Sequence, residues 1–175
     1  MCRAAPRAPH PHPSAHPHSS VIAIPASPIV IDTNVSLDLW LFARDEQLRE
    51  GRSAARLIGT LEMRDELCSV LHHSAAGRGP IAAGRMPPHA PAVVLASWDR
   101  HVRVVEAPSH PKPLWPRCRD ASDQKFVDLA LAESAGWLLT RDRALLKLAR
   151  RCRAYGLVIA APEAATLGSA PFASI

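Results

Sequence analysis

The residues of this chain best placed to do chemistry are four acids, each at the end of an apolar run or in a helical segment close to one. They are Asp32, Glu66, Asp123 and Asp142. Asp32 directly follows the apolar run 29–31, and Asp142 comes shortly after the run 137–140. In a parallel α/β sheet such junctions gather along the carboxyl edge of the strands, where ligands bind. The spacing therefore predicts that these carboxylates share one site.

Carboxylates that share a site repel one another and stay ionised only when a cation or a basic neighbour compensates their charge. Mg²⁺ takes oxygen ligands and keeps several waters, so a few carboxylates are enough to hold it. Two ions roughly 3.5–4 Å apart can stabilise the attacking and leaving oxygens of a phosphodiester displacement. No Cys–His pair lies near the four acids, which disfavours zinc. The pattern indicates a site for phosphodiester chemistry that depends on Mg²⁺ or Mn²⁺.

Each acid also has a structural explanation when it is taken alone. Asp32, Asp123 and Asp142 could cap, or favourably charge, the first turn of the helix that follows each of them. Glu66 could be one polar residue on a solvated helix face. The joint pattern favours the chemical interpretation, because three of the acids fall at junctions expected on one edge of one sheet.

The elements that must position these acids follow from the pattern of apolar residues. Apolar runs predict strands at 29–31, 102–105, 137–140 and 156–159, and helical spacing predicts helices at 35–43, 60–72, 122–135 and 142–153. Further predictions are a helical stretch at 45–50, either helix or strand at 53–59, a long loop at 74–91, and a strand or helix fragment at 93–96. This order predicts an α/β fold with a mostly parallel sheet and right-handed crossovers.

The first 27 residues are expected to form a disordered tail, and residues 28–175 a single folded domain. Seven of the chain's 17 prolines fall by Pro28, among many Ala, Ser and His residues. Such a composition buries too little apolar area to offset the entropy of ordering. The histidines of this tail could bind transition metals, although a low-complexity extension is the simpler explanation. They are His10, His12, His16 and His18.

Composition and charge limit the classes of protein to which the chain can belong. Its net charge of +5 and pI near 9.5 suit a polyanionic partner without proving one. No run of 18 uncharged apolar residues occurs, and no apolar segment follows Arg3 and Arg7, so neither a membrane span nor a secretory signal is expected. The four cysteines lack CxxC spacing, which predicts reduced thiols. A cytoplasmic location is therefore expected.

Four sequence blocks, taken together and in this order, resemble those of the PIN-domain nucleases. The blocks are Val30-Ile31-Asp32-Thr33-Asn34, Met63-Arg64-Asp65-Glu66-Leu67, Asp120-Ala121-Ser122-Asp123-Gln124-Lys125-Phe126, and Leu138-Leu139-Thr140-Arg141-Asp142. The resemblance covers roughly residues 28–160 and is greatest to the bacterial branch that supplies the toxins of toxin–antitoxin systems. Arg141, the long segment 74–91 and the His-Pro tail depart from the family pattern.

The resemblance implies a Rossmann-like α/β/α sandwich that cleaves RNA with Mg²⁺ or Mn²⁺. Asp32 would be the central metal ligand, and Glu66, Asp123 and Asp142 would complete the acidic pocket. The resemblance also implies supporting roles for three further residues. Asn34 would orient the pocket by hydrogen bonding, Thr140 would offer its hydroxyl beside it, and Asp120 would be an outer partner. Arg141 and Arg143 could contact a substrate phosphate, although Arg141 could instead pair with an acid and weaken metal binding.

The expected partners are an RNA substrate, a cognate antitoxin protein and a second copy of the chain. Two other classes of function remain open at this point. A PIN-fold module that binds nucleic acid or protein without turnover would keep the same fold. A phosphatase of the haloacid-dehalogenase type also begins with Asp at a strand end, but it carries a second Asp where this chain has Asn34. A dinucleotide-binding role is excluded, because no glycine-rich turn follows the first strand.

Overall fold

A five-stranded, wholly parallel sheet lies at the centre of the computed structural model, which describes residues 27–42, 57–78, 86–87, 89–109 and 112–166. The strand order is β3-β2-β1-β4-β5. The strands are β1 (Ile29–Ile31), β2 (Leu57–Gly59), β3 (Val102–Val104), β4 (Trp137–Leu139) and β5 (Val158–Ala160). Each has three residues, and β1 is central and buried along its whole length.

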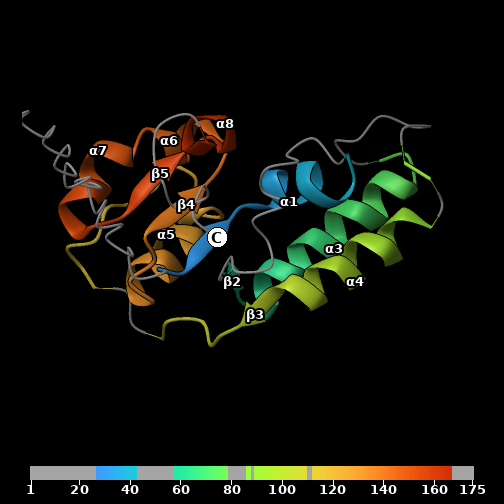
Figure 1. Cartoon of the computed structure of the whole chain (residues 1–175), viewed down its shortest axis with the longest axis horizontal. Coiled ribbons are helices and arrows are strands. Elements are labelled where there is room, and N and C mark those ends of the chain that lie inside the picture. Colours follow the sequence, from blue (N-terminus) through green and yellow to red (C-terminus); the bar gives the residue numbers. More distant parts are fainter. Residues whose placement is uncertain (1–26, 43–56, 79–85, 88, 110–111, 167–175) are drawn as a thin grey trace, which may run out of the picture.

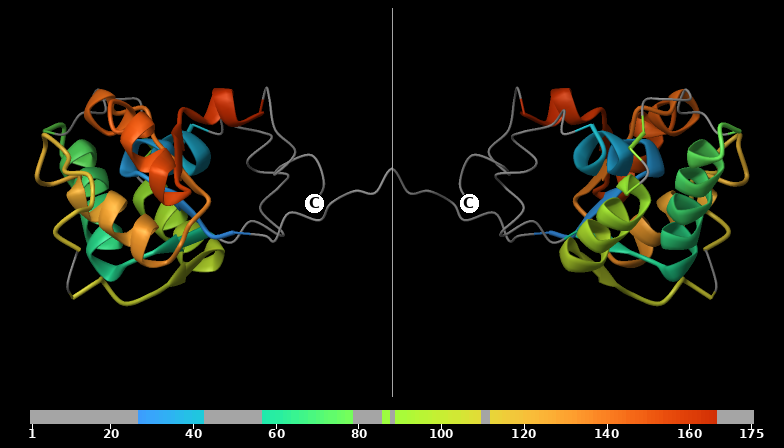
Figure 2. Two further views of the ribbon diagram at one scale, coloured as in Figure 1. Left: turned by 90° about the vertical axis from the view of Figure 1, so that its left-hand side faces the viewer. Right: turned by 90° about the vertical axis from the view of Figure 1, so that its right-hand side faces the viewer.

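Helices cover both faces of this sheet, as Figures 1 and 2 show. On one face lie α1 (Thr33–Trp40), α3 (Leu61–Ala75) and α4 (Ala90–His101). On the other lie α5 (Gln124–Ala132), α6 (Arg143–Leu146) and α7 (Ala149–Cys152). A 3₁₀ turn (Arg153–Tyr155) leads into β5, and α8 (Pro162–Thr166) follows that strand.

The two cores follow from the alternation of side chains along each strand. In β1, Ile29 and Ile31 belong to the cluster beneath α1, α3 and α4, whereas Val30 belongs to the cluster beneath α5–α7. In β2, Leu57 belongs to the first of these clusters and Ile58 to the second. Apolar residues on both sides of a strand are what a sheet with two covered faces requires. The prediction of a three-layered α/β/α fold is therefore confirmed.

The parallel register brings the carboxyl ends of the strands to one edge. Ile31 pairs with Leu139, so the residues that follow them, Asp32 and Thr140, lie next to each other. The amide of Asp32 donates to the carbonyl of Leu139 (3.1 Å), and the amide of Thr140 donates to that of Ala160 (3.0 Å). The ladder thus continues one residue past each strand and fixes the backbone at the candidate site.

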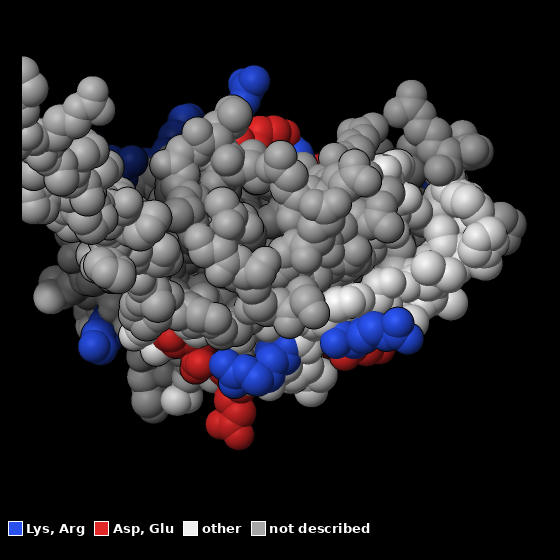
Figure 3. Space-filling view, in the orientation of Figure 1, with Lys and Arg blue, Asp and Glu red and all other residues white. Residues whose placement is uncertain are grey.

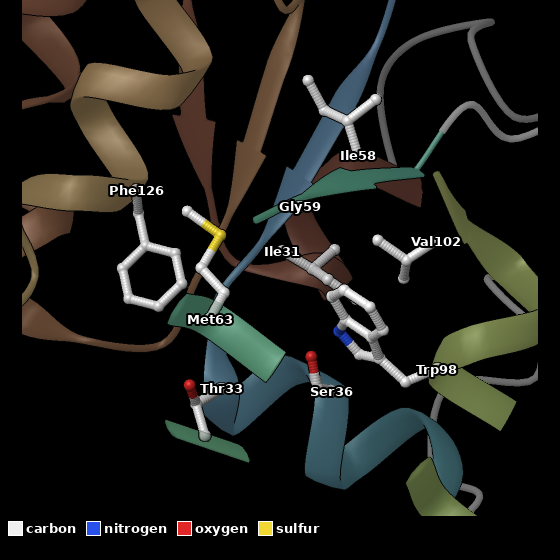
Figure 4. A pocket seen from close by; sticks show the side chains of 9 residues that line it. All are labelled: Ile31, Thr33, Ser36, Ile58, Gly59, Met63, Trp98, Val102 and Phe126. Carbon is white, nitrogen blue, oxygen red and sulfur yellow. The ribbon is translucent and has the colours of Figure 1, made fainter. Parts of the chain in front are cut away.

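Strand β2 ends in a glycine because a helix side chain lies directly over it. A Cβ atom at Gly59 would come within 2.9 Å of Trp98 Cζ2 and 3.0 Å of Val102 Cγ1. Trp98 is buried on α4, and its ring borders a cavity of about 10 Å³ that also meets Thr33 and Ser36 of α1 (Figure 4). A space of that size holds one water molecule at most. Gly59 directly precedes Thr60, which caps α3, the helix that carries Glu66.

Residues 90–101 form the twelve-residue helix α4. The strand or helix fragment predicted at 93–96 is therefore helical, but the helix is longer than predicted and begins within the loop predicted at 74–91. The β-branched pair at 93–94 and the proline at 91 have low helix propensity, so the sequence pattern did not predict the full helix. Pro91 lies in the first turn, where a proline is tolerated, and Val94 and Trp98 bury the face that packs on α1 and α3.

Smaller differences concern the ends of other elements. Residues 57–59, which were ambiguous, form the strand β2, and the helix predicted at 142–153 is split into α6 and α7. The predicted tail up to residue 26, the stretch 45–50 and much of the loop 74–91 lie outside the described residues. Among the helices that are described, none is both long and apolar enough to cross a membrane.

Candidate acidic active site

Asp32 is the most deeply buried of the four acids. It caps the N-terminus of α1, where its Oδ1 accepts a hydrogen bond from the amide of Val35 (2.7 Å). Its Oδ2 accepts a hydrogen bond from the hydroxyl of Thr140. Only 3% of Asp32 is exposed, and burial raises its pKa from 3.8 to about 6, against the opposing effect of these two hydrogen bonds. A carboxylate so buried is costly unless a cation compensates it.

Thr140 links Asp32 to Asp142. Its hydroxyl donates to Asp32 and accepts a hydrogen bond from the amide of Asp142 (2.9 Å). The Asp142 carboxylate in turn caps α6, where its Oδ1 accepts from the amides of Ala144 (2.6 Å) and Leu145 (3.1 Å). Thr140 is fully buried, so the junction between β4 and α6 is held in one conformation.

Asp123 directly precedes α5 and is electrostatically coupled to the other acids. Its carboxylate makes no capping hydrogen bond, and the residue is half-buried. Burial raises its pKa, and Asp142, Asp120 and Glu66 raise it further, whereas Lys125 lowers it. Asp123 and Asp142 likewise raise the pKa of Asp32. These mutual effects mean that the four predicted acids form one electrostatic cluster.

Glu66 reaches this cluster from α3, and both of its oxygens are engaged. Thr33 Oγ1 donates to Glu66 Oε1 (2.5 Å), and Lys125 Nζ lies 2.5 Å from Glu66 Oε2. The same ammonium lies 3.5 Å from Oε1 of Glu62. Neither partner of Glu66 was predicted from the sequence. Their positions were the signal that could have identified them, because Thr33 directly follows Asp32 and Lys125 lies two residues after Asp123.

Two of the predicted supporting residues, Asn34 and Asp120, are exposed. Asn34 is exposed, and within the described part of the chain no hydrogen bond joins its side chain to an acid. Asp120 is exposed, and its carboxylate accepts from the hydroxyl (2.7 Å) and the amide (2.9 Å) of Ser122, which lower its pKa. It acts on Asp123 only through its charge.

Arg141 pairs with acids outside the cluster. One guanidinium nitrogen contacts Asp38 of α1, and two others bond Oε1 of Glu163 in α8, with Nη2 at 2.5 Å and Nε at 3.1 Å. The guanidinium thus clamps α8 to α1. This geometry does not support the expected phosphate contact of Arg141, whereas Arg143 is exposed at the start of α6.

Replacement of Arg141 by Gln is expected to lower the free energy of unfolding by about 1–2 kcal/mol, because the partly buried Asp38 loses its cation. Urea denaturation measures the change. Arg143→Gln is the matched control and should change stability by less than about 0.5 kcal/mol. Equal effects of the two substitutions would contradict the clamp.

The chemistry of the donor set fits a hard divalent cation. All four groups offer carboxylate oxygens, which Mg²⁺ and Mn²⁺ prefer. Asp123 has no hydrogen-bond partner in the described part of the chain, so its oxygens remain available. Among the described residues, no three or more His, Cys, Asp and Glu side chains lie close enough together to hold a metal ion. One physical reason for this spacing is that the Glu66 carboxylate is bonded to Thr33 and Lys125.

Among the described residues visible in Figure 3, basic side chains do not outnumber acidic ones in a patch of their own. On this face, acidic and basic side chains lie next to each other along the lower edge, beneath β3 and the adjoining helices. Along this edge the visible described residues therefore offer local phosphate contacts rather than a continuous row of basic side chains.

The comparison with protein families gives a match. The sequence model of a family described as "PIN domain" matches residues 28–144, which include all four acids. Searches of curated proteins and of solved structures give no match.

Proposed function

Because the chain belongs to the PIN-domain family, we propose that it is an endoribonuclease that hydrolyses RNA phosphodiester bonds at an acidic Mg²⁺ or Mn²⁺ site. The family supports a nuclease type of function. The observation that carries the proposal is the buried carboxylate of Asp32, linked through Thr140 to Asp142 and electrostatically coupled to Asp123. Such a group calls for a cation, and Asp142 and Asp123 beside it offer further carboxylate oxygens.

In this mechanism Asp32, Glu66, Asp123 and Asp142 would hold the ion. When bound, a divalent ion lowers the pKa of water and stabilises charge on phosphate oxygens. The chain itself contributes the positioning. Hydrogen bonds from Thr140 and from the α1 amide of Val35 fix the orientation of the Asp32 carboxylate, while the α6 amides fix Asp142. Asp123, free of such bonds, can adjust its carboxylate to the ligand.

A catalytically silent PIN-fold module that binds nucleic acid or protein is the second candidate. The observation that favours it is the ion pair between Lys125 and Glu66, which already neutralises part of the acidic cluster without a metal ion. A module of this kind would keep the fold and the electrostatics and would lack turnover.

The biological setting that we propose is that of a toxin whose activity a cognate antitoxin protein suppresses, with a homodimer as the working form. This part of the proposal rests on the resemblance to toxin components. A neighbouring gene for a small antitoxin would support it. Suppression of cleavage by the product of that gene, added in equimolar amounts, would test it directly.

The deciding experiment is cleavage of labelled single-stranded and structured RNAs with Mn²⁺, with Mg²⁺ or with EDTA. We expect products that require a metal ion and that disappear with EDTA. A folded protein that gives no products with either metal on any of these RNAs would favour the silent module.

Asp120→Asn is expected to reduce cleavage less than Asp123→Asn does. Asp120 is exposed and bonds Ser122, whereas Asp123 is half-buried and electrostatically coupled to Asp142. We expect a loss of about tenfold or less for Asp120→Asn and of about 100-fold or more for Asp123→Asn. Initial cleavage rates at saturating Mn²⁺ compare the two. Equal losses would mean that the inner ligand has been assigned wrongly.

A further inference from the structure

Lys125 holds the only ammonium group that the described residues place against the acidic cluster. Its Nζ lies 2.5 Å from Glu66 Oε2 and 3.5 Å from Glu62 Oε1, both on α3. The side chain is only 18% exposed, and Nζ lies 5.7 Å from the centre of the Phe126 ring. The ammonium is therefore confined between α3, α5 and an aromatic face, rather than extended into water.

The position of Lys125 in its helix is unfavourable without these acids. It is the second residue of α5, and the N-terminus of a helix carries partial positive charge, so a cation there is repelled. The carboxylates of α3 offset this repulsion. Lys125 also lowers the pKa of Asp123, so its charge acts on the aspartate that directly precedes the helix. One ammonium thus balances acids from two elements of the cluster.

The geometry of Glu66 implies that Lys125 and a divalent ion would compete for the Glu66 carboxylate. Its Oε1 accepts from Thr33 and its Oε2 is paired with Lys125, so neither oxygen is without a partner. Each oxygen can accept a second partner, but a divalent ion that takes Glu66 Oε2 as a ligand would lie next to the Lys125 ammonium, which is 2.5 Å from that oxygen. The hydroxyl can remain beside a metal-bound carboxylate, whereas two cations at one oxygen repel each other.

We propose that Lys125 is a built-in counter-ion of the acidic site, which competes with the divalent ion for Glu66 and so sets the metal concentration at which the site fills. This inference rests on the proposed function and concerns its regulation. Lys125 is a positioning residue in this scheme: it neutralises part of the metal-free cluster and withdraws from Glu66 when the ion binds.

The test is the affinity of the full-length protein for Mn²⁺ alone, measured by isothermal titration calorimetry. Lys125→Met removes the charge and keeps most of the length of the side chain. We expect it to bind Mn²⁺ about tenfold more tightly than the wild type, since a nearby positive charge no longer opposes the ion. Lys125→Arg keeps the charge and should stay within about threefold of the wild type. Lys147→Met, at an exposed position after α6, is the matched control and should not change the affinity.

A second measurement separates competition from a merely structural clamp between α3 and α5. In EDTA, Lys125→Met should melt at a lower temperature than the wild type, because the acids lose their counter-ion. In saturating Mn²⁺ that deficit should disappear, since the ion replaces the ammonium. A clamp that plays no part in metal binding predicts the same deficit in both conditions.

The outcomes distinguish this inference from the proposed function. Wild-type binding of Mn²⁺ that Lys125→Met leaves unchanged or weakens would overturn the competition and leave the metal site intact. Binding that appears only in Lys125→Met would support the competition in its strongest form. No binding in any variant, with cleavage also absent, would overturn the metal site and this inference together.

Discussion

Replacement of Asp32 by Asn is expected to abolish metal-dependent RNA cleavage without unfolding the protein. Asn is as good an N-cap as Asp, so the hydrogen bond to the amide of Val35 can be kept. The negative charge at the centre of the cluster is lost, and with it the strongest attraction for a divalent ion. We expect cleavage to fall by about 10³-fold or more, in line with the several kcal/mol that a metal ion supplies. Initial rates at saturating Mn²⁺ measure the loss.

The same substitution is expected to stabilise the metal-free protein at neutral pH. In the folded state the pKa of Asp32 is about 6, above its ordinary value of 3.8. The folded state therefore binds the proton more tightly, and stability falls as the pH rises from about 4 through 6. At about 1.4 kcal/mol per pKa unit the full cost of ionisation is about 3 kcal/mol. Imperfect hydrogen bonding of Asn to Thr140 offsets part of this, so we expect a net gain of about 2 kcal/mol above pH 7.

Urea denaturation in EDTA between pH 4 and pH 8 measures this effect. The advantage of Asp32→Asn should be largest above pH 6 and should shrink to a small fraction near pH 4, where Asp32 is protonated in the folded state and only about half ionised in the unfolded state. Asp65→Asn is the matched control, because Asp65 is exposed on α3 next to Glu66. It should change neither the cleavage rate nor the pH profile. Retained cleavage by Asp32→Asn would refute the metal-site assignment, and a stability difference independent of pH would contradict the burial argument.

The parallel sheet could be predicted because its signals are local. The runs at 29–31 and 137–139 are short, apolar and rich in branched residues, and each is followed by a polar residue that ends the strand. The positions of Asp32 and Asp142 follow from the same signal, since both cap a helix after a strand. Burial and capping are related here: the strand places the acid at the sheet edge, and the helix amides hold it there.

The remaining features depend on contacts between distant parts of the chain. Helix α4 exists because Val94 and Trp98 pack under α1 and α3, and its local sequence gives little sign of this. The partners of Arg141 are likewise remote, since Asp38 precedes it by 103 residues. No periodicity indicates such a pair. The ammonium of Lys125 was missed for the same reason, because its acids lie on another helix, α3.

Replacement of Thr140 by Val is expected to impair both stability and cleavage at once. The substitution keeps the shape of the side chain and removes a hydroxyl that donates to Asp32 and accepts from the amide of Asp142. Both groups lose a partner at a position that is fully buried. We expect the free energy of unfolding to fall by about 1–3 kcal/mol. Cleavage should fall by about 10- to 100-fold, as for other residues that orient metal ligands.

The pH dependence distinguishes this role of Thr140 from simple packing. Its hydrogen bond lowers the pKa of Asp32, so without the hydroxyl the pKa should rise further above 6. Asp32 then ionises only at higher pH, and the rising limb of the profile of kcat/KM against pH should move to higher pH in Thr140→Val. Thr140→Ser keeps the hydroxyl and should restore the wild-type limb, with a small loss of stability from the missing methyl group. A limb that stays in place in Thr140→Val would mean that the hydroxyl does not act on the ionisation of Asp32, whatever it contributes to packing.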